Sequence, residues 1–157
     1  NNALRYRSLT YVTIPDTVLE IGEEAFGSLS SGSSNSSIKL PKNLKKIGDS
    51  AFYNCKNLGG AITIPAGVTE ILSYTFCNTN ITEVTIPDSV AMIGENTFSF
   101  CTELTTVKLP SHPIQYLHTG GYRYGSEGGN NDAFKGCGKL SLATRKAIQD
   151  SGYTGEF

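Results

Sequence analysis

The sequence predicts a solenoid, a single domain in which short coils of chain stack on one another. Prolines preceded by Ile or Leu recur at nearly regular intervals, at Pro15, Pro41, Pro65, Pro87 and Pro110. A phenylalanine follows each of the first four prolines at one fixed distance, at Phe26, Phe52, Phe76 and Phe98. Such a period is typical of stacked repeats, so we expect an α/β-type repeat solenoid, mostly β and irregular, of about five right-handed coils. One parallel sheet and a C-terminal capping helix complete the predicted fold.

A strand is expected just before each proline. There the chain alternates apolar and polar residues, many of them β-branched, which is the pattern of a half-buried strand. The five predicted strands are 12–14, 38–40, 62–64, 84–86 and 107–109. Proline ends each strand because it has no N–H to donate to a sheet.

The part of each unit after the proline reads Val-x-x-Ile-Gly-x-x-Ala-Phe with small variations. We interpret it as chain that turns repeatedly inward, with Gly22, Gly48 and Gly94 at tight corners. One unit buries too few apolar groups to fold alone, so the coils must stack. A spacing of about 4.8 Å between strands then places equivalent residues directly over one another.

Charged residues test this register. The residue directly after the proline is Asp16 in the first unit and Lys42 in the second, and the fifth residue is Glu20 and Lys46. Stacked coils bring these opposite charges together. We therefore interpret the lysines around Pro41 as a solvated, neutralised face rather than a nucleic-acid or lipid patch, because the net charge of the chain is only −1.

Three of the four cysteines, Cys55, Cys101 and Cys137, lie at the same place after a phenylalanine of the Ala-Phe motif. Thr79 lies in the same column between Cys55 and Cys101, which places those two about 10 Å apart, too far for a disulfide. We interpret the column as buried thiols rather than metal or redox ligands. The sequence leaves open a disulfide between Cys101 and Cys137. Cys77 fits no metal spacing.

The chain has 157 residues, which form a single domain, 1–157, with a continuous core. It contains no apolar run approaching the roughly 18 residues of a membrane-spanning helix, no signal peptide and no initiator Met. We therefore expect a soluble, mature or excised segment without membrane insertion, with further repeats upstream. We also expect a monomer that binds no nucleic acid and no cofactor.

The motifs Leu-x-x-Val-x-Ile-Pro, Ile-Gly-x-x-Ala-Phe and Phe-x-x-Cys recur together in successive units across 4–140. In this they resemble the BspA-like leucine-rich repeats of bacterial surface antigens. The resemblance implies a curved leucine-rich solenoid belonging to a secreted or surface-anchored bacterial protein. It also implies adhesion and binding of host or bacterial proteins, and no catalysis.

The outward side of the sheet is the first candidate partner surface, because solenoids present flat, rigid arrays of side chains there. Its side chains are small and polar, with few of the aromatic and Arg residues that anchor hot spots. The candidate binding residues on this face are Tyr11, Thr13, Lys39, Thr63, Glu83, Thr85 and Lys108.

The second candidate is an insertion at 111–132, which places Phe134 more than twice as far from Pro110 as the other phenylalanines lie from their prolines. Tyr beside Gly and Ser is a composition typical of binding loops. The candidate residues are Tyr116, His118, Tyr122, Arg123 and Tyr124. An inert insertion is the alternative, with Tyr116 in the inward column that other units fill with Ile. Excising 111–131 is expected to leave thermal unfolding nearly unchanged. The other insertion, 27–37, is a Ser-rich polar loop.

No catalytic or metal site is expected. His112 and His118 are the only histidines, and no recognised spacing of metal ligands surrounds them. Ser111, His118 and Asp132 have the residue types of a hydrolytic triad, but no nucleophile elbow or oxyanion element accompanies them.

The repeat stops after Leu140, and 141–157 is expected to form a C-terminal cap. A helix should begin after Ser141 and end at Gly152, with Leu142, Ala143, Ala147 and Ile148 near one face. We expect this helix to cover the exposed end of the last coil rather than to bind a partner.

The expected function is that of a non-enzymatic protein-binding or adhesion module, extracellular or at a bacterial cell surface. The expected partner is a host surface or extracellular-matrix protein. Two alternatives stay open. One is carbohydrate binding, with Tyr122 and Tyr124 as stacking platforms, and the other is a structural spacer within a larger protein.

Overall fold

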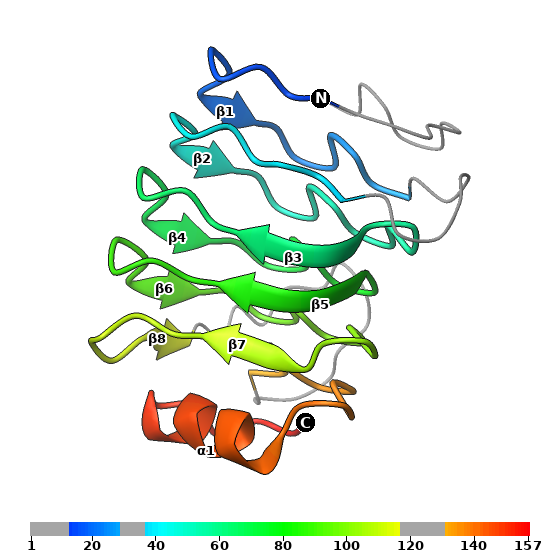
Figure 1. Ribbon diagram of the computed structural model, residues 1–157. Helices are drawn as coiled ribbons and strands as arrows, with labels where there is room; N and C mark the ends of the chain where they lie inside the picture. The colour runs from blue at the N-terminus through cyan, green and yellow to red at the C-terminus, as the bar shows by residue number, and fades with distance from the viewer. Residues whose placement is uncertain (1–12, 29–36, 117–130) are drawn as a thin grey trace.

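The computed structural model describes residues 13–28, 37–116 and 131–157. The chain winds into stacked coils with a single helix at one end of the stack (Figure 1). We number the coils 1 to 5 by their prolines, from Pro15 in coil 1 to Pro110 in coil 5. The predicted solenoid with a C-terminal helix is thereby confirmed.

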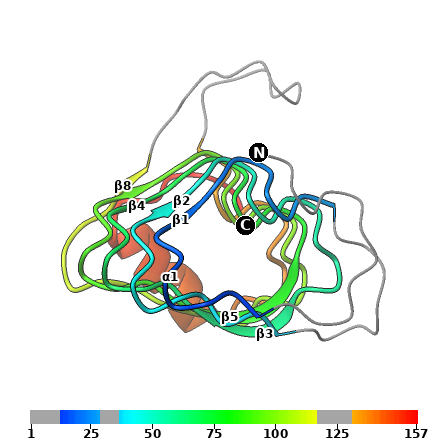
Figure 2. The same ribbon diagram turned by 90° about the horizontal axis from the view of Figure 1, so that it is seen from above.

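Short strands run along two sides of the stack (Figure 2). On one side, β3 (Gly59–Thr63), β5 (Asn80–Thr85) and β7 (Thr106–Lys108) form a parallel sheet. On the other, β1 (Glu20–Ile21) pairs in parallel with β2 (Lys46–Ile47). There, too, β4 (Glu70–Ile71), β6 (Met92–Ile93) and β8 (Gln115–Tyr116) form a third parallel sheet.

The prediction of one sheet with five strands was wrong. The strands of coils 3 to 5 form where expected, but Thr13 and Ile14 in coil 1 and 38–40 in coil 2 belong to no strand. The stretch from Phe26 to Pro41 is longer than the equivalent stretches between the later coils. Among the described residues, neither 13–14 nor 38–40 forms a ladder with a neighbouring coil, whereas 62–63 pairs in register with 84–85. The strands on the second side were not predicted, because a strand of two residues is too short to show an alternation of apolar and polar residues.

Five phenylalanines form the centre of the core. The rings of Phe26, Phe52, Phe76, Phe98 and Phe134 stack one above the next, with centroids 5.1, 5.3, 5.7 and 5.4 Å apart. Around them lie the buried aliphatic residues of each coil. Equivalent columns therefore stack as predicted, and apolar burial between coils is the main stabilising interaction.

The corners of the coils are made by residues other than glycine. The residue two positions before the core phenylalanine has a left-handed φ of 51° at Glu24, 54° at Ser50, 56° at Tyr74 and 54° at Asn96. Gly48 and Gly94 serve a different purpose from the one predicted. A Cβ on Gly94 would lie 2.5 Å from Ser73 N, so glycine lets neighbouring coils approach closely.

The charge register is confirmed. Lys42 forms an ion pair with Asp16 at 3.4 Å, and Glu20 stands opposite Lys46 in the β1–β2 ladder. In coils 4 and 5 the same column places Ser111 N 2.7 Å from Asp88 Oδ1. Contacts at this position therefore fix coil 2 against coil 1 and coil 5 against coil 4.

All four cysteines are free and buried. The thiols of Cys55, Cys101 and Cys137 each donate to the carbonyl oxygen of a core phenylalanine in the preceding coil, at 2.8, 3.1 and 3.1 Å. Burial raises the pKa of the Cys101 thiol to about 11 and that of Cys77 to about 12. The burial of Cys55, Cys101 and Cys137 confirms the prediction from their shared column, and Cys77 is buried as well.

The helix α1 (Leu142–Asp150) covers the last coil, and the Ser141 side chain accepts a hydrogen bond from Thr144 N at its start. The predicted buried face was largely wrong. Ile148 is fully buried, whereas Leu142, Ala143 and Ala147 are exposed. The tail after the helix supplies the missing apolar cover, since Tyr153 lies in the core and its ring contacts Phe157 at 5.3 Å.

Candidate functional site

The sheet of β3, β5 and β7 carries the candidate residues that the structure brings together. In its register Thr63 stands beside Thr85 and Thr85 beside Lys108. The next outward row is Ala61, Glu83 and Thr106. Between these rows Ile62, Val84 and Val107 point into the core. Alternation along each strand therefore presents two adjacent rows of side chains on a buried base.

One ion pair dominates the electrostatics of this sheet face. Lys108 Nζ lies 2.6 Å from Glu83 Oε1 across the ladder, and Glu83 is the less exposed partner. Cross-strand pairs of this kind orient side chains but contribute little stability when exposed. The face is thus a flat, nearly neutral array of hydroxyl groups with one fixed charge pair.

The N-terminal candidates are less well placed. Thr13 and Lys39 are exposed but belong to no strand, and Tyr11 lies outside the described residues. The candidate face is therefore defined by coils 3 to 5.

Tyr116, at the start of the insertion, takes the inward column rather than an outward position. It stands opposite Ile93 in the β6–β8 ladder, and its ring lies 5.3 Å from that of Tyr153. Its hydroxyl lies 2.7 Å from Ser151 Oγ, and burial raises its pKa to about 12. Tyr116 therefore joins coil 5 to the cap. His118, Tyr122, Arg123 and Tyr124 lie outside the described residues.

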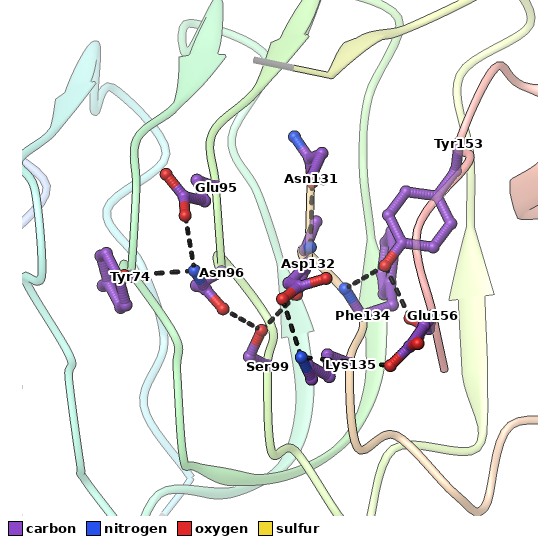
Figure 3. A network of polar contacts seen from close by, with 11 residues as sticks. Tyr74, Glu95, Asn96, Ser99, Asn131, Asp132, Phe134, Lys135, Tyr153 and Glu156 are labelled. Atoms are coloured by element: carbon purple, nitrogen blue, oxygen red, sulfur yellow. Dashed lines mark hydrogen bonds and ion pairs between the residues drawn. The ribbon is translucent and has the colours of Figure 1, made fainter. Parts of the chain in front are cut away.

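The end of the insertion is tied to coils 3 and 4 through a polar network (Figure 3). Asn96 Nδ2 donates to Tyr74 Oη and to Glu95 Oε1, both at 3.2 Å. The single hydroxyl hydrogen of Ser99 is shared between Asn96 Oδ1, which lies 2.9 Å from Ser99 Oγ, and the main-chain oxygen of Asp132. Glu95, Asn96 and Ser99 are all buried, so the network fixes this corner of coil 4 against the returning chain.

The same corner is joined to the C-terminal tail. Lys135 Nζ lies 3.0 Å from Asp132 Oδ2 and 4.0 Å from Glu156 Oε2, and the Asp132 hydrogen bond raises the Lys135 pKa. Tyr153 Oη donates to Glu156 O at 2.7 Å and accepts from Phe134 N at 3.2 Å. Both ends of the insertion therefore rest on ordered scaffold.

Phe100 is a surface feature that the sequence analysis missed. Its side chain is 51% exposed, and its φ is 59°. A Cβ on Gly136 would lie 2.9 Å from Phe100 Cδ1, which places the ring against the next coil. The only sequence signal is a break in one column, where Ser28, Asn54 and Asn78 occupy the preceding coils.

The described residues contain no group of three or more His, Cys, Asp or Glu side chains that could hold a metal ion. In the same part of the chain no helix is long and apolar enough to cross a membrane.

Sequence comparison assigns the repeat. The profile of the BspA-type leucine-rich repeat region matches residues 28–123 in six copies, so the chain belongs to this family. No curated protein matches it.

Two solved structures share the fold. One is a leucine-rich repeat protein of T. pallidum, with 26% identity and a TM-score of 0.75 over 92% of this chain and 60% of that one. The other is a leucine-rich cell surface protein of Faecalibacterium prausnitzii, with 25% identity and a TM-score of 0.65. It covers 92% of this chain, which spans 36% of its length. Both structures are therefore substantially longer than the chain described here.

Proposed function

We propose that this solenoid is a non-catalytic protein-binding module of a bacterial protein exposed outside the cell. The family and the description of the F. prausnitzii structure as a cell surface protein support the location. The partner we propose is a host surface or extracellular-matrix protein.

The observation that carries this proposal is the β3–β5–β7 face. Its outward residues stand in register on three strands whose inward residues are buried, so little ordering entropy is lost when a partner docks. Small hydroxyl side chains permit close approach, and the Glu83–Lys108 pair offers one fixed polar contact. A face without aromatic anchors supports modest affinity, which is suited to reversible adhesion.

Binding to immobilised collagens and laminins, measured by surface plasmon resonance, tests the proposal. The double variant Thr63→Arg, Thr85→Glu should weaken binding at least tenfold, because it replaces two neighbouring hydroxyls with bulky charges. The matched control is Thr69→Arg, Ala91→Glu, at exposed positions of neighbouring coils just before β4 and β6 on the other strand-bearing side. Equal losses in both variants would refute a role for the sheet face.

The insertion is the second candidate surface, and the structure changes how it should be removed. Excising 111–131 would delete Ile114, Tyr116 and Asn131, which are packed into the scaffold, so we now expect this excision to lower the thermal stability. Replacing only 117–130 with a glycine–serine linker preserves these anchors. Loss of binding in this variant alone would assign the partner to the insertion.

The two alternatives have distinct outcomes. Carbohydrate recognition rests on Tyr122 and Tyr124, which lie outside the described residues, and would give saccharide binding on a glycan array. A structural spacer would bind neither matrix proteins nor saccharides. Saccharide binding would favour carbohydrate recognition over the proposed protein-binding function, and no binding at all would favour the structural spacer.

A further inference from the structure

Both ring nitrogens of the partly exposed His112 side chain face main-chain carbonyl oxygens, so the charged ring can donate a hydrogen bond to each. Its Nε2 lies 2.8 Å from the main-chain oxygen of Asp88, and its Nδ1 lies 2.9 Å from the main-chain oxygen of Pro113. Carbonyl oxygens only accept hydrogen bonds. Neutral imidazole has one N–H and one lone pair, whereas imidazolium has two N–H donors. Deprotonation therefore leaves a ring lone pair facing an oxygen lone pair at hydrogen-bond distance.

The charged groups around His112 come from two sides. From coil 4, the Asp88 carboxylate accepts hydrogen bonds from Ser111 N and Oγ at 2.7 and 3.1 Å, and these hold the Asp88 pKa below its ordinary value. From the end of α1, Asp150 lines the same cleft of about 420 Å³ and pairs with Lys146 at 2.9 Å. The Asp88 carboxylate favours a cation at this position, whereas the Asp150 carboxylate is paired with Lys146.

The segment that follows His112 holds the end of the solenoid together. Ile114 N donates to Ser151 O at 3.2 Å, and Gln115 N donates to Ala91 O at 2.9 Å. Gln115 and Tyr116 then form β8 beside β6. His112 therefore lies two and three residues before the main-chain contacts that join coil 5 to the cap and to coil 4.

We propose that His112 is a protonation-dependent latch that fastens the 111–116 segment to coil 4 when charged and loosens it when neutral. The latch goes beyond the proposed binding function and does not depend on it. It makes the junction between coil 5 and the cap sensitive to pH near neutrality, where histidine changes charge.

The direction of the effect follows from the two hydrogen bonds. The Pro113 and Asp88 carbonyls, followed by the negative charge of Asp88, raise the His112 pKa above its ordinary 6.5. Charged His112 therefore stabilises the folded state fully below pH 6.5. This stabilisation is lost as the pH rises through the higher pKa that His112 has in the folded state.

The chain has two histidines, so His118→Gln leaves His112 as the only imidazole to titrate. In a ¹⁵N NMR titration of this variant, we expect a midpoint above 6.5 and two ring N–H signals at low pH. The Ser111 and Gln115 amides should shift with the same midpoint. A midpoint at or below 6.5, or amides that do not follow it, would overturn the latch.

Two further variants separate the latch from simple packing. Asp88→Asn keeps both the main-chain oxygen and an acceptor for Ser111, so it should lower the His112 midpoint without disordering the turn. His112→Gln should reduce the change in urea midpoint between about pH 5.5 and about pH 8. An unchanged pH dependence in this variant would also contradict the proposal. If His112→Gln does not fold, the titration of the His118→Gln variant decides the matter.

Discussion

Phe98 and Phe100 lie two positions apart and have opposite environments. Phe98 is fully buried between Phe76 and Phe134, whereas Phe100 is 51% exposed. Phe98→Ala should cost about 3–5 kcal/mol, since it opens a cavity in a continuous stack of rings. Urea unfolding followed by circular dichroism measures this loss.

Phe100→Asn is expected to change the free energy of unfolding by no more than about 0.5 kcal/mol. The loss of a half-exposed ring, about 1 kcal/mol, is offset by relief of a left-handed φ that asparagine tolerates better. Asn54 and Asn78 already occupy this column. A cost near that of Phe98→Ala would show that the ring packs more tightly than its exposure indicates.

The repeat predicted the burial of Phe98 but did not predict the exposure of Phe100. The repeat column identified every stacked phenylalanine, because a large apolar residue at a fixed interval has to be buried. The contact of His112 with the main-chain oxygen of Asp88 joins two coils and involves no side chain of Asp88, so no residue pattern could reveal it. The inward column proposed as an alternative for Tyr116 came from repeat alignment, and the structure agrees with it.

Glycine at one column lets coil 4 approach coil 3 closely, whereas coil 3 itself has Leu72 at the same position. A Cβ on Gly94 would lie 2.5 Å from Ser73 N and 2.8 Å from Leu72 C, both rigid main-chain atoms. Gly94→Ala should therefore cost about 1–3 kcal/mol through forced separation of coils 3 and 4.

Gly138→Ala is the control, since nothing lies within 4 Å of its Cβ position. This change should be neutral or stabilise by up to about 1 kcal/mol, because alanine restricts the unfolded chain. Equal thermal shifts for the two variants would show that close coil approach is not the constraint.

The cap helix depends on one residue rather than on a broad apolar face. Ile148 is fully buried, whereas Leu142 is 85% exposed. Ile148→Ala should cost about 2–5 kcal/mol, and Leu142→Ala no more than about 0.5 kcal/mol. Thermal unfolding of both variants tests this, and a large effect at Leu142 would indicate that its side chain is covered in solution.

The elements differ in how far sequence could predict them. The boundaries of α1 were predictable because Ser141 and Gly152 are strong end signals, and the strands of coils 3 to 5 because alternation runs through 62–64, 84–86 and 107–109. The buried face of α1 was not predictable, since Tyr153 and Phe157 compete for the same surface. The outward placement of Thr63, Thr85 and Lys108 followed directly from strand alternation.

In the described parts of the molecule, the strands of each coil pair with those of the adjacent coils, and the cap closes one end. Stability is then the sum of repeated interfaces, and the same chemistry recurs in each of them. One consequence is a series of buried thiols and phenols. Cys77, Cys101 and Cys137 lie in coils 3 to 5, while Tyr116 and Tyr153 lie at the cap.

This series predicts loss of stability at alkaline pH. Burial raises the pKa of Cys101 from 9.0 to about 11 and that of Cys77 from 9.0 to about 12, and it also raises that of Cys137. Above pH 9 the unfolded chain releases these protons while the folded chain retains them, so the free energy of unfolding falls as pH rises. Each retained proton contributes a slope of about 1.4 kcal/mol per pH unit.

Cys101→Thr tests the account, because Thr79 already fills the same column and its hydroxyl also bonds the Phe76 carbonyl. Urea midpoints for the wild type and the variant, measured from about pH 8 to about pH 10.5, should diverge as the wild type loses stability faster. Iodoacetamide should also leave the thiols of the folded protein unmodified, since only the thiolate reacts. Parallel pH curves for the two proteins would show that Cys101 does not retain its proton in the folded state.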